Sequence, residues 1–366
     1  MHIRVFKFLF AFLFLLTFLV ACFQGEQSNI NSLDGVNDDS NGNQENVNDD
    51  QDHTNMNNSN NGEINEDRDE LNEETAKREL YLLDVNDMIV AQTFDLPLPE
   101  SKEVATQVLQ YLVKDGPVTE LLPNGFQAVL PEGTEILGVS LQEDGSIIVD
   151  FSEEFTNYQA EEESKILQSV TYTLTQFDSI DRVYLRINGH PISEMPINGT
   201  PVEEGYSRAK GINYYITDTI DLITSVPVTL YYPAEYNESR YFVPITQHIN
   251  KEEEDPFTDL VSALIDGPSY EANVIHVFNT ETALIEPPKL EGGILQLEFN
   301  NHILKDPDEQ IIADDVMETL TRTLTNHPTV NAIKVKVDDV NVIMNEKGEE
   351  YLEPVTIDYF TEDKKI

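Results

Sequence analysis

The stretch TYTLTQFDSIDRVYLRI, residues 171–187, recurs without a gap as TRTLTNHPTVNAIKVKV, residues 321–337. Two shorter matches precede it in the same order in both copies. They are DGSIIVDFSEEF, from Asp144, with EGGILQLEFNNH, from Glu291, and LVKDGP, ending at Pro117, with ALIDGP, ending at Pro268. Ordered matches of this kind predict that the chain carries one domain twice.

Each copy begins with a predicted amphipathic helix. Apolar residues recur at helical spacing over residues 104–112 and again over residues 260–264. Both helices end at Asp-Gly-Pro, where glycine would take the left-handed cap position and proline cannot continue the helix. In the second copy, Asp255 and Pro256 supply an N-cap and a first-turn proline. We therefore interpret Asp-Gly-Pro as a helix stop rather than as a functional site.

The rest of each copy alternates in the manner of half-buried strands. The alternating segments are 147–151 and 183–187 in the first copy, and 295–299 and 333–337 in the second. A second helix precedes the last strand, over 166–177 and 316–324, and LYLLD with VAQTFDLPL, or VTLYYP with RYFVPI, forms an opening hairpin. The predicted fold class is α+β: two tandem repeats, each a small, mostly antiparallel sheet with two helices packed on one face.

The outward residues of these strands carry opposite charges. Asp150 and Glu298 point outward from the middle strand, and Arg186 and Lys336 from the last strand. If the two strands are neighbours, cross-strand ion pairs would form on the wet face of each sheet.

The single cysteine of the chain, Cys22, follows an apolar run. Arg4 and Lys7 precede residues 8–20, which are too short to span a bilayer and are typical of a signal peptide. Ala21 before Cys22 is similar to a bacterial lipoprotein signal, which implies acylation of the thiol and cleavage ahead of it. Cys22 is therefore the predicted lipidation site, and the mature chain is expected outside the cytoplasmic membrane.

The chain after Cys22 divides into a spacer and two domains. Residues 22–79 are rich in asparagine and acidic residues, with almost nothing to bury, so we expect a disordered linker. Its segment from Asp39 resembles a calcium loop but has Gln44 where that loop needs glycine. The predicted boundaries are 1–21 for the signal peptide, 22–79 for the linker, 80–216 for the first repeat and 217–361 for the second repeat.

Charge and motifs limit the function classes. With 22 basic against 68 acidic residues and a net charge of −46, the chain has no basic patch for nucleic acid. It contains no Gly-x-Ser-x-Gly elbow, no His-Glu-x-x-His helix and no phosphate loop. The histidines are scattered, and His276, in VIHVF, is expected to be a strand residue. We therefore expect no enzyme activity, no catalytic residues, no cofactor and no metal site.

The duplicated pattern resembles the GerMN domain family. The resemblance is carried by Asp-Gly-Pro after the first helix, by the central strands ending at Phe151 and Phe299, and by Thr-Leu-Thr before the last strand. It implies a ring-building type of fold and a role in spore formation and germination, in an assembly between mother cell and forespore. It also implies sporulation-complex proteins as partners, with self-association or ring assembly, in the space between those membranes.

Two other functions stay open on the residues alone. An extracytoplasmic small-ligand-binding lipoprotein would need a sizeable apolar pocket between the two copies. A cell-wall hydrolase would need a pair of carboxylates with separated pKa values in a deep cleft.

Overall fold

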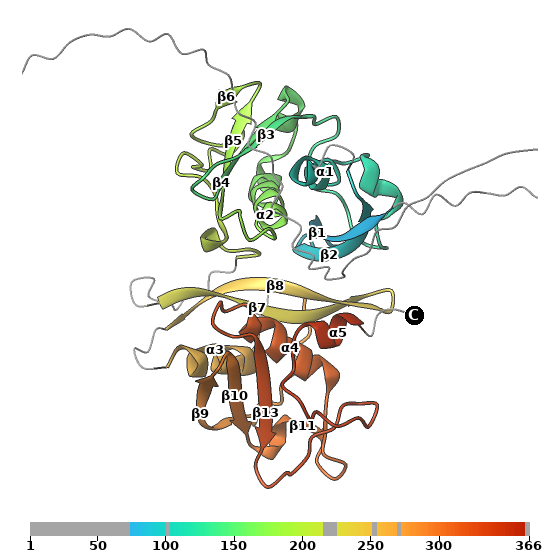
Figure 1. The fold of residues 1–366 in the computed structure, drawn as a ribbon, viewed down its shortest axis with the longest axis vertical. Helices are drawn as coiled ribbons and strands as arrows, with labels where there is room; N and C mark the ends of the chain where they lie inside the picture. Colours follow the sequence, from blue (N-terminus) through green and yellow to red (C-terminus); the bar gives the residue numbers. More distant parts are fainter. Residues whose placement is uncertain (1–73, 100–102, 215–224, 251–254, 269–271, 363–366) are drawn as a thin grey trace, which may run out of the picture.

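The computed structural model describes residues 74–99, 103–214, 225–250, 255–268 and 272–362 (Figure 1). No helix within these ranges is both long and apolar enough to cross a membrane. The elements of the first repeat are β1 (Thr75–Leu83), β2 (Ile89–Pro97), α1 (Val104–Gln110), η1 (Pro117–Glu120), β3 (Ile136–Leu141), β4 (Ser146–Phe151), η2 (Glu153–Thr156), η3 (Ala160–Glu162), α2 (Glu163–Leu174), β5 (Arg182–Ile187), β6 (His190–Pro191) and η4 (Arg208–Lys210).

The second repeat follows the same order, with additions after its central strand. Its elements are β7 (Ser225–Tyr236), β8 (Ser239–Asn250), α3 (Pro256–Asp266), β9 (Leu284–Glu291), β10 (Ile294–Phe299), η5 (Asn301–Ile303), β11 (Leu304–Asp306), β12 (Ile311–Ile312), α4 (Asp314–Thr325), β13 (Ala332–Val337) and α5 (Asp358–Glu362). This layout confirms the predicted duplication and the α+β class.

In each repeat the hairpin and the larger sheet are separate sheets with the helices between them, and the second repeat adds a small third sheet, β11-β12. In the first repeat the larger sheet has the order β3-β4-β5-β6, and the opening hairpin β1-β2 forms a sheet of its own. Helix α2 lies between the hairpin and the larger sheet, and α4 lies likewise between β7-β8 and the sheet β13-β10-β9 (Figure 1). The hairpin therefore covers the helices on the side away from the larger sheet.

One strand pair in each larger sheet is parallel. β4 pairs with β5 in parallel, and β10 pairs with β13 in parallel, whereas β3-β4 and β9-β10 are antiparallel. Each parallel pair is joined through a helix, α2 between β4 and β5 and α4 between β10 and β13, because two parallel strands need a long crossover connection. Ile147, Val149 and Phe151 of β4 are buried, as the alternation predicted.

The Thr-Leu-Thr motif attaches the second helix to the hairpin. In the first repeat, the backbone N–H of Tyr81 donates to Thr173 Oγ1 at 3.0 Å, and Ser169 Oγ donates to the Tyr81 carbonyl at 2.6 Å. In the second repeat, the N–H of Tyr231 donates to Thr323 Oγ1 at 3.0 Å. Side chains of the helix thus satisfy backbone groups of the strand that would otherwise lack partners.

Asp-Gly-Pro ends the first helix only in the second repeat, which corrects the interpretation for the first: α1 already ends at Gln110, and the motif lies in the turn between α1 and the start of η1. In the second repeat Gly267 follows α3 with φ +89° and ψ 177°, a conformation that favours glycine but is not the predicted left-handed helical cap, and Asp255 accepts from Phe257 N. In the first repeat the left-handed residue is Asp115, at φ 59°, while Gly116 has φ −85°. Glycine is needed there for space, because a Cβ at Gly116 would stand 2.8 Å from the carbonyl oxygen of Val113.

His276 is not a strand residue, contrary to the sequence prediction. It lies in an irregular segment after α3, and its Nε2 is 2.8 Å from the carbonyl oxygen of Ile265. The alternation of VIHVF therefore does not mark a strand. The segment follows the end of α3, and the His276 ring is held by the carbonyl of Ile265 at that end.

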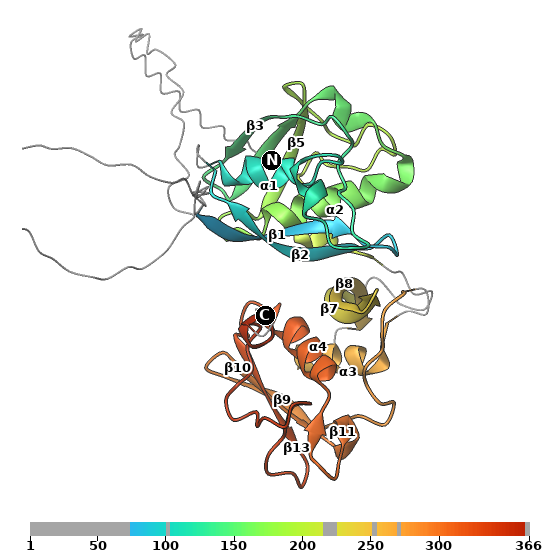
Figure 2. The ribbon, with the colours of Figure 1, turned by 90° about the vertical axis from the view of Figure 1, so that its right-hand side faces the viewer.

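The two repeats meet through their hairpins, which lie next to each other in both views (Figures 1 and 2). Asn213 joins them: its Oδ1 accepts from Ile89 N at 2.8 Å, and its Nδ2 donates to the carbonyls of Ile89 at 2.7 Å and Pro244 at 2.8 Å. Tyr241 Oη donates to Asp84 Oδ2 at 2.8 Å in a buried contact. We call this contact the seam; it makes the two repeats one block.

The Thr173 hydroxyl offers a direct test of the helix–hairpin attachment. Replacing it by valine, Thr173→Val, keeps the shape but leaves the buried N–H of Tyr81 without an acceptor, which should lower the free energy of unfolding by about 1–3 kcal/mol. Urea unfolding followed by circular dichroism measures this loss.

Thr325→Val is the matched control for this variant. The Thr325 hydroxyl bonds only the carbonyl of Thr321 in its own helix, so its loss should cost about 0.5 kcal/mol or less. Equal costs for the two variants would contradict the attachment.

Candidate functional site

The outer faces of the two larger sheets are the candidate interaction surfaces. Their strands share one register: Asp150 faces Arg186 across β4 and β5, and Glu298 faces Lys336 across β10 and β13. The predicted adjacency of these strands is confirmed. The predicted ion pairs do not form among the described residues, and Asp150 Oδ1 instead accepts from Gly189 N at 2.9 Å.

The next row of outward residues, which lie side by side across the strands of each larger sheet, differs between the repeats. In the first repeat, Ser140, Ile148 and Tyr184 stand side by side on β3, β4 and β5. In the second repeat, the same row on β9, β10 and β13 is Lys289, Gln296 and Lys334. The first repeat therefore presents an apolar and aromatic row where the second presents charge.

An open depression of about 330 Å³ lies on the outer face of the first repeat. Its lining comes from β4, β5, β6 and the chain after β6: Ile148, Tyr184, Leu185, Arg186, Pro191, Ile192, Ser193 and Glu203. The pocket that the ligand-binding alternative needs was expected between the two copies, whereas the residues that line this depression all belong to the first repeat. Its lining combines apolar side chains with one cation, Arg186, and one carboxylate, Glu203.

A buried carboxylate fixes the loop over residues 193–203, which lies beside this depression. Glu163, the first residue of α2, is 0% exposed. Its Oε2 accepts from Tyr158 Oη at 2.8 Å and from Asn198 N at 2.7 Å, and its Oε1 accepts from Thr200 N at 3.0 Å and from Thr200 Oγ1 at 2.6 Å. Burial alone would raise the pKa of Glu163, but the bonds from Thr200 and its neighbours outweigh burial and hold it below the usual value.

This carboxylate acts on the site through the ends of the loop. Both Val202 N and Glu203 N donate to the carbonyl of Ser193, at 2.9 and 3.0 Å, which closes the loop that Glu163 holds. Ser193 and Glu203 line the depression. Sequence reasoning missed Glu163, because it ends a run of three glutamates and looks solvated there.

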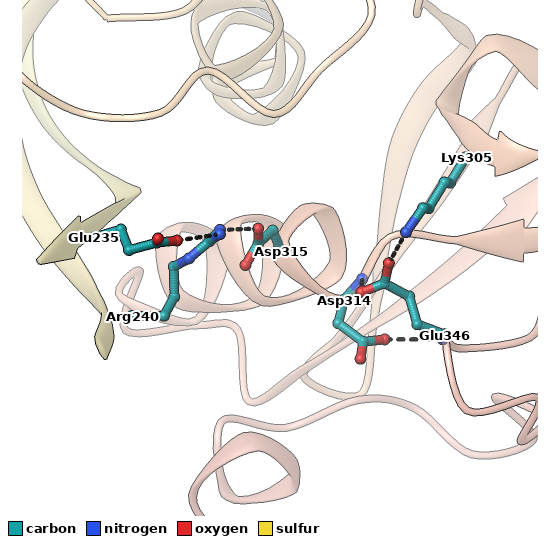
Figure 3. Close-up of polar contacts among 6 residues, drawn as sticks. All are labelled: Glu235, Arg240, Lys305, Asp314, Asp315 and Glu346. Carbon is teal, nitrogen blue, oxygen red and sulfur yellow. Dashed lines mark hydrogen bonds and ion pairs between the residues drawn. The ribbon is translucent and has the colours of Figure 1, made fainter. Parts of the chain in front are cut away.

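The start of α4 in the second repeat carries exposed ion pairs instead (Figure 3). Arg240 on β8 lies between two carboxylates, with its Nη2 2.9 Å from Glu235 Oε2 and its Nη1 bonded to Asp315. Because these groups are partly exposed, each pair contributes little stability. Their position indicates that they orient the hairpin β7-β8 on α4.

A second ion pair lies on the other side of the same helix start. Lys305 bonds Glu346, whose backbone N donates to Asp314 Oδ1 at 3.2 Å (Figure 3). Burial raises the pKa of Asp314, while the hydrogen bond from Lys305 lowers that of Glu346. Among the residues that the structure describes, no group of three histidine, cysteine or acidic side chains is arranged to hold a metal ion.

Cys22, the predicted lipidation site, lies outside the described residues. So do the signal peptide and almost all of the predicted linker. The tether therefore stays a prediction from the sequence.

The role of Glu163 is testable by Glu163→Gln. The amide cannot accept all the bonds that the carboxylate accepts, and its NH₂ opposes the Thr200 donors, so we expect a loss of about 1–3 kcal/mol in the free energy of unfolding at pH 7. Because the folded-state pKa of Glu163 is lowered, its contribution is present above the unfolded pKa and is lost as pH falls through the folded value. Urea unfolding at pH 7 and again below pH 4.5 measures both effects.

Glu162→Gln is the neighbouring control. Glu162 pairs with Lys114 at 2.7 Å with 32% of its side chain exposed, and its Oε2 accepts from Gln159 N at 2.8 Å. A glutamine carbonyl can still accept from Gln159 N, and the partly exposed ion pair is weak, so Glu162→Gln should cost less than about 1 kcal/mol. If the cost of Glu163→Gln were unchanged below the carboxylate pKa range, the proposed role of its charge would be wrong.

Three comparisons with known proteins agree with the geometry. A family model named Germane, for sporulation and spore germination, matches residues 79–193 and 229–342. The spore germination protein GerM of Bacillus subtilis (strain 168) is 46% identical over 284 residues, which cover 77% of this chain and 77% of that protein. The solved tandem GerMN domains of the sporulation protein GerM from Bacillus subtilis share 45% identity and cover 77% of this chain and 96% of that chain, with a TM-score of 0.71.

These matches confirm the resemblance to tandem GerMN domains and the fold class inferred from the repeated stretch. Both family matches fall on the two repeats, and the solved relative contains both domains in tandem. The chain belongs to the Germane family of sporulation and spore germination proteins.

Proposed function

We propose that the chain is a membrane-tethered assembly protein of spore formation and germination, which acts by protein–protein contacts and not by catalysis. Its lipid would be attached at Cys22, and it would work outside the cytoplasmic membrane, in the space between mother cell and forespore. Its partners would be proteins of a ring-like or channel-like complex. The chain's membership in a sporulation and spore germination family supports the setting.

One structural observation carries the assembly role: the seam makes a single block with two outward sheet faces. Asn213 and the buried contact of Tyr241 with Asp84 hold the hairpins together, and the larger sheets lie on opposite sides of them (Figures 1 and 2). A block of this kind can hold two neighbours at a fixed separation. A hinge between the repeats could not do so.

Small-ligand capture is the second candidate, and the depression beside Tyr184 and Arg186 favours it. Ligand sites usually bury most of a small molecule's surface in a cleft. This depression is open and lies on a sheet face next to exposed polar groups, so it fits a protruding side chain of a partner better than an enclosed solute.

The tether is tested by Cys22→Ala. Without the thiol no acyl chain can be attached, so the variant should leave the membrane fraction while its unfolding curve stays unchanged. Fractionation and urea unfolding measure the two properties, with Gln24→Ala as a control that keeps the thiol. A Cys22→Ala chain that stays in the membrane would count against lipidation.

The assembly role is tested by photo-crosslinking in sporulating cells. A photoreactive side chain at position 184 should crosslink a membrane-complex protein during sporulation and not during growth. The same probe at position 334 examines the equivalent row of the second repeat. If neither position crosslinks a protein, and affinity purification of the full chain also brings down no membrane-complex protein, the assembly role is wrong.

A further inference from the structure

The two larger sheets differ at one free edge. β3 is the edge strand in the first repeat, and β9 is the edge strand in the second. Val139 of β3 faces Val149 of β4, whereas Leu297, which has the place of Val149 in β10, stands opposite Pro287 and Pro288. Proline has no N–H to donate, so β9 cannot offer a complete ladder to another strand.

The backbone of β3 keeps both kinds of group free. Gln142 N donates to the Ser146 carbonyl at 2.8 Å, which places Gln142 and, by alternation, Ser140 at the bonded positions of the antiparallel pair. Val139 and Leu141 therefore direct their N–H and C=O groups away from β4. No described residue pairs with β3 along that side.

The side chains of β3 do not protect this edge. Natural edges are usually blunted by lysine, proline or inward charges, and β3, ILGVSL, has none of these. Its bulge near Leu137 is the one protective feature, and Leu137 is itself 49% exposed. The equivalent strand of the second repeat, LIEPPKLE, has two prolines and a lysine.

The chain segments that flank β3 in sequence are acidic. Glu132 and Glu135 precede the strand and Glu143 and Asp144 follow it, and all four are exposed. Residues 116–164 contain no lysine or arginine at all. A strand that pairs here would be favoured by basic residues near both of its ends.

A second copy of this chain does not fit the edge. Two β3 strands related by a two-fold axis pair antiparallel, which brings Glu135 of one chain near Glu143 of the other and sets like charges together. Pairing β3 with β9 of a neighbour fails at Pro287 and Pro288, which lack N–H groups. β13, the other edge of that sheet, is already bridged to Val355 at Ile333, so it does not offer a free edge for β3 either. The free edge thus fits a different protein.

We propose that β3 of the first repeat accepts an extended strand from another protein, with small or apolar residues in its middle and lysine or arginine at its ends. The main chain would supply affinity by adding a strand to the sheet, and the acidic flanks would select the partner. This inference rests on the proposed assembly function, for which it names one contact surface and the chemistry of its partner.

The test uses hydrogen exchange of the full chain with a synthetic peptide. The peptide alternates valine and threonine between a pair of lysines at each end, and a second peptide has glutamates instead. The lysine peptide should slow amide exchange in residues 136–142 by about tenfold or more, because the free N–H groups gain acceptors. The glutamate peptide should give no protection.

Val139→Pro and Val139→Ala form the matched pair of variants. Both lose the valine side chain, but only proline removes the free N–H, so protection should disappear in Val139→Pro and persist in Val139→Ala. The double variant Glu135→Lys with Glu143→Lys keeps the backbone and should weaken the lysine peptide by about tenfold. If Val139→Pro does not fold, this double variant still tests the proposal, because Glu135 and Glu143 are exposed and their replacement should not disturb folding.

Three outcomes of the exchange experiments would overturn the proposal. They are equal protection by both peptides, full protection of a folded Val139→Pro chain, and protection without peptide that depends on chain concentration, which would indicate a second copy. Affinity purification from sporulating cells separates this inference from the assembly role. If the wild type and the charge-reversed variant bring down the same partners, the β3 inference fails and the assembly role stands; if the wild type brings down none, the assembly role fails.

Discussion

The second helix of each repeat is buried on two opposite sides, and this burial governs the rest of the fold. In α2, ten of the twelve residues are buried, including Ser169, Thr171 and Thr173. A helix in this position needs polar groups that reach the backbone of the covering strand, since buried N–H and C=O groups must find partners. Ser169 and Thr173 do so by bonding both peptide groups of Tyr81. The repeated Thr-Leu-Thr stretch is therefore explained by packing, because its first threonine bonds a backbone N–H of the covering hairpin.

The second repeat satisfies this requirement less completely. Thr319 stands where the first repeat has Ser169, and its hydroxyl is buried without a hydrogen-bond partner among the described residues. Only the N–H of Tyr231 is bonded, through Thr323. The helix of the first repeat is thus bonded to its hairpin at two backbone groups of one residue. The helix of the second repeat is bonded to its hairpin at one backbone group, the N–H of Tyr231. The ion pair of Arg240 with Asp315 adds a surface contact between β8 and α4.

Sequence patterns predicted what depends on neighbours along the chain and missed what depends on distant ones. The strand alternation ending at Phe151 and Phe299, the hairpins and the cap at Asp255 are local, and the structure contains them. The depression depends on β4, β5 and a returning loop, and the loop depends on Glu163, whose pattern in the chain is that of a solvated glutamate. His276 shows the opposite error, in which a local alternation is overridden by contact with the end of a helix.

Duplication preserved the register of the parallel strand pair in each larger sheet but not the surfaces of the sheets, and this difference bears on assembly. The sheets keep the same strand pairing, because a shift of one residue would turn the buried face outward. The outer rows are free to change: the second repeat carries Lys289, Lys334 and Lys336, whereas the first has an apolar row and an acidic edge. Since the block presents unlike surfaces at its two ends, identical contacts at both ends are disfavoured. A chain with a net charge of −46 also repels its own copies, so unlike neighbours suit the block better than a second copy of itself.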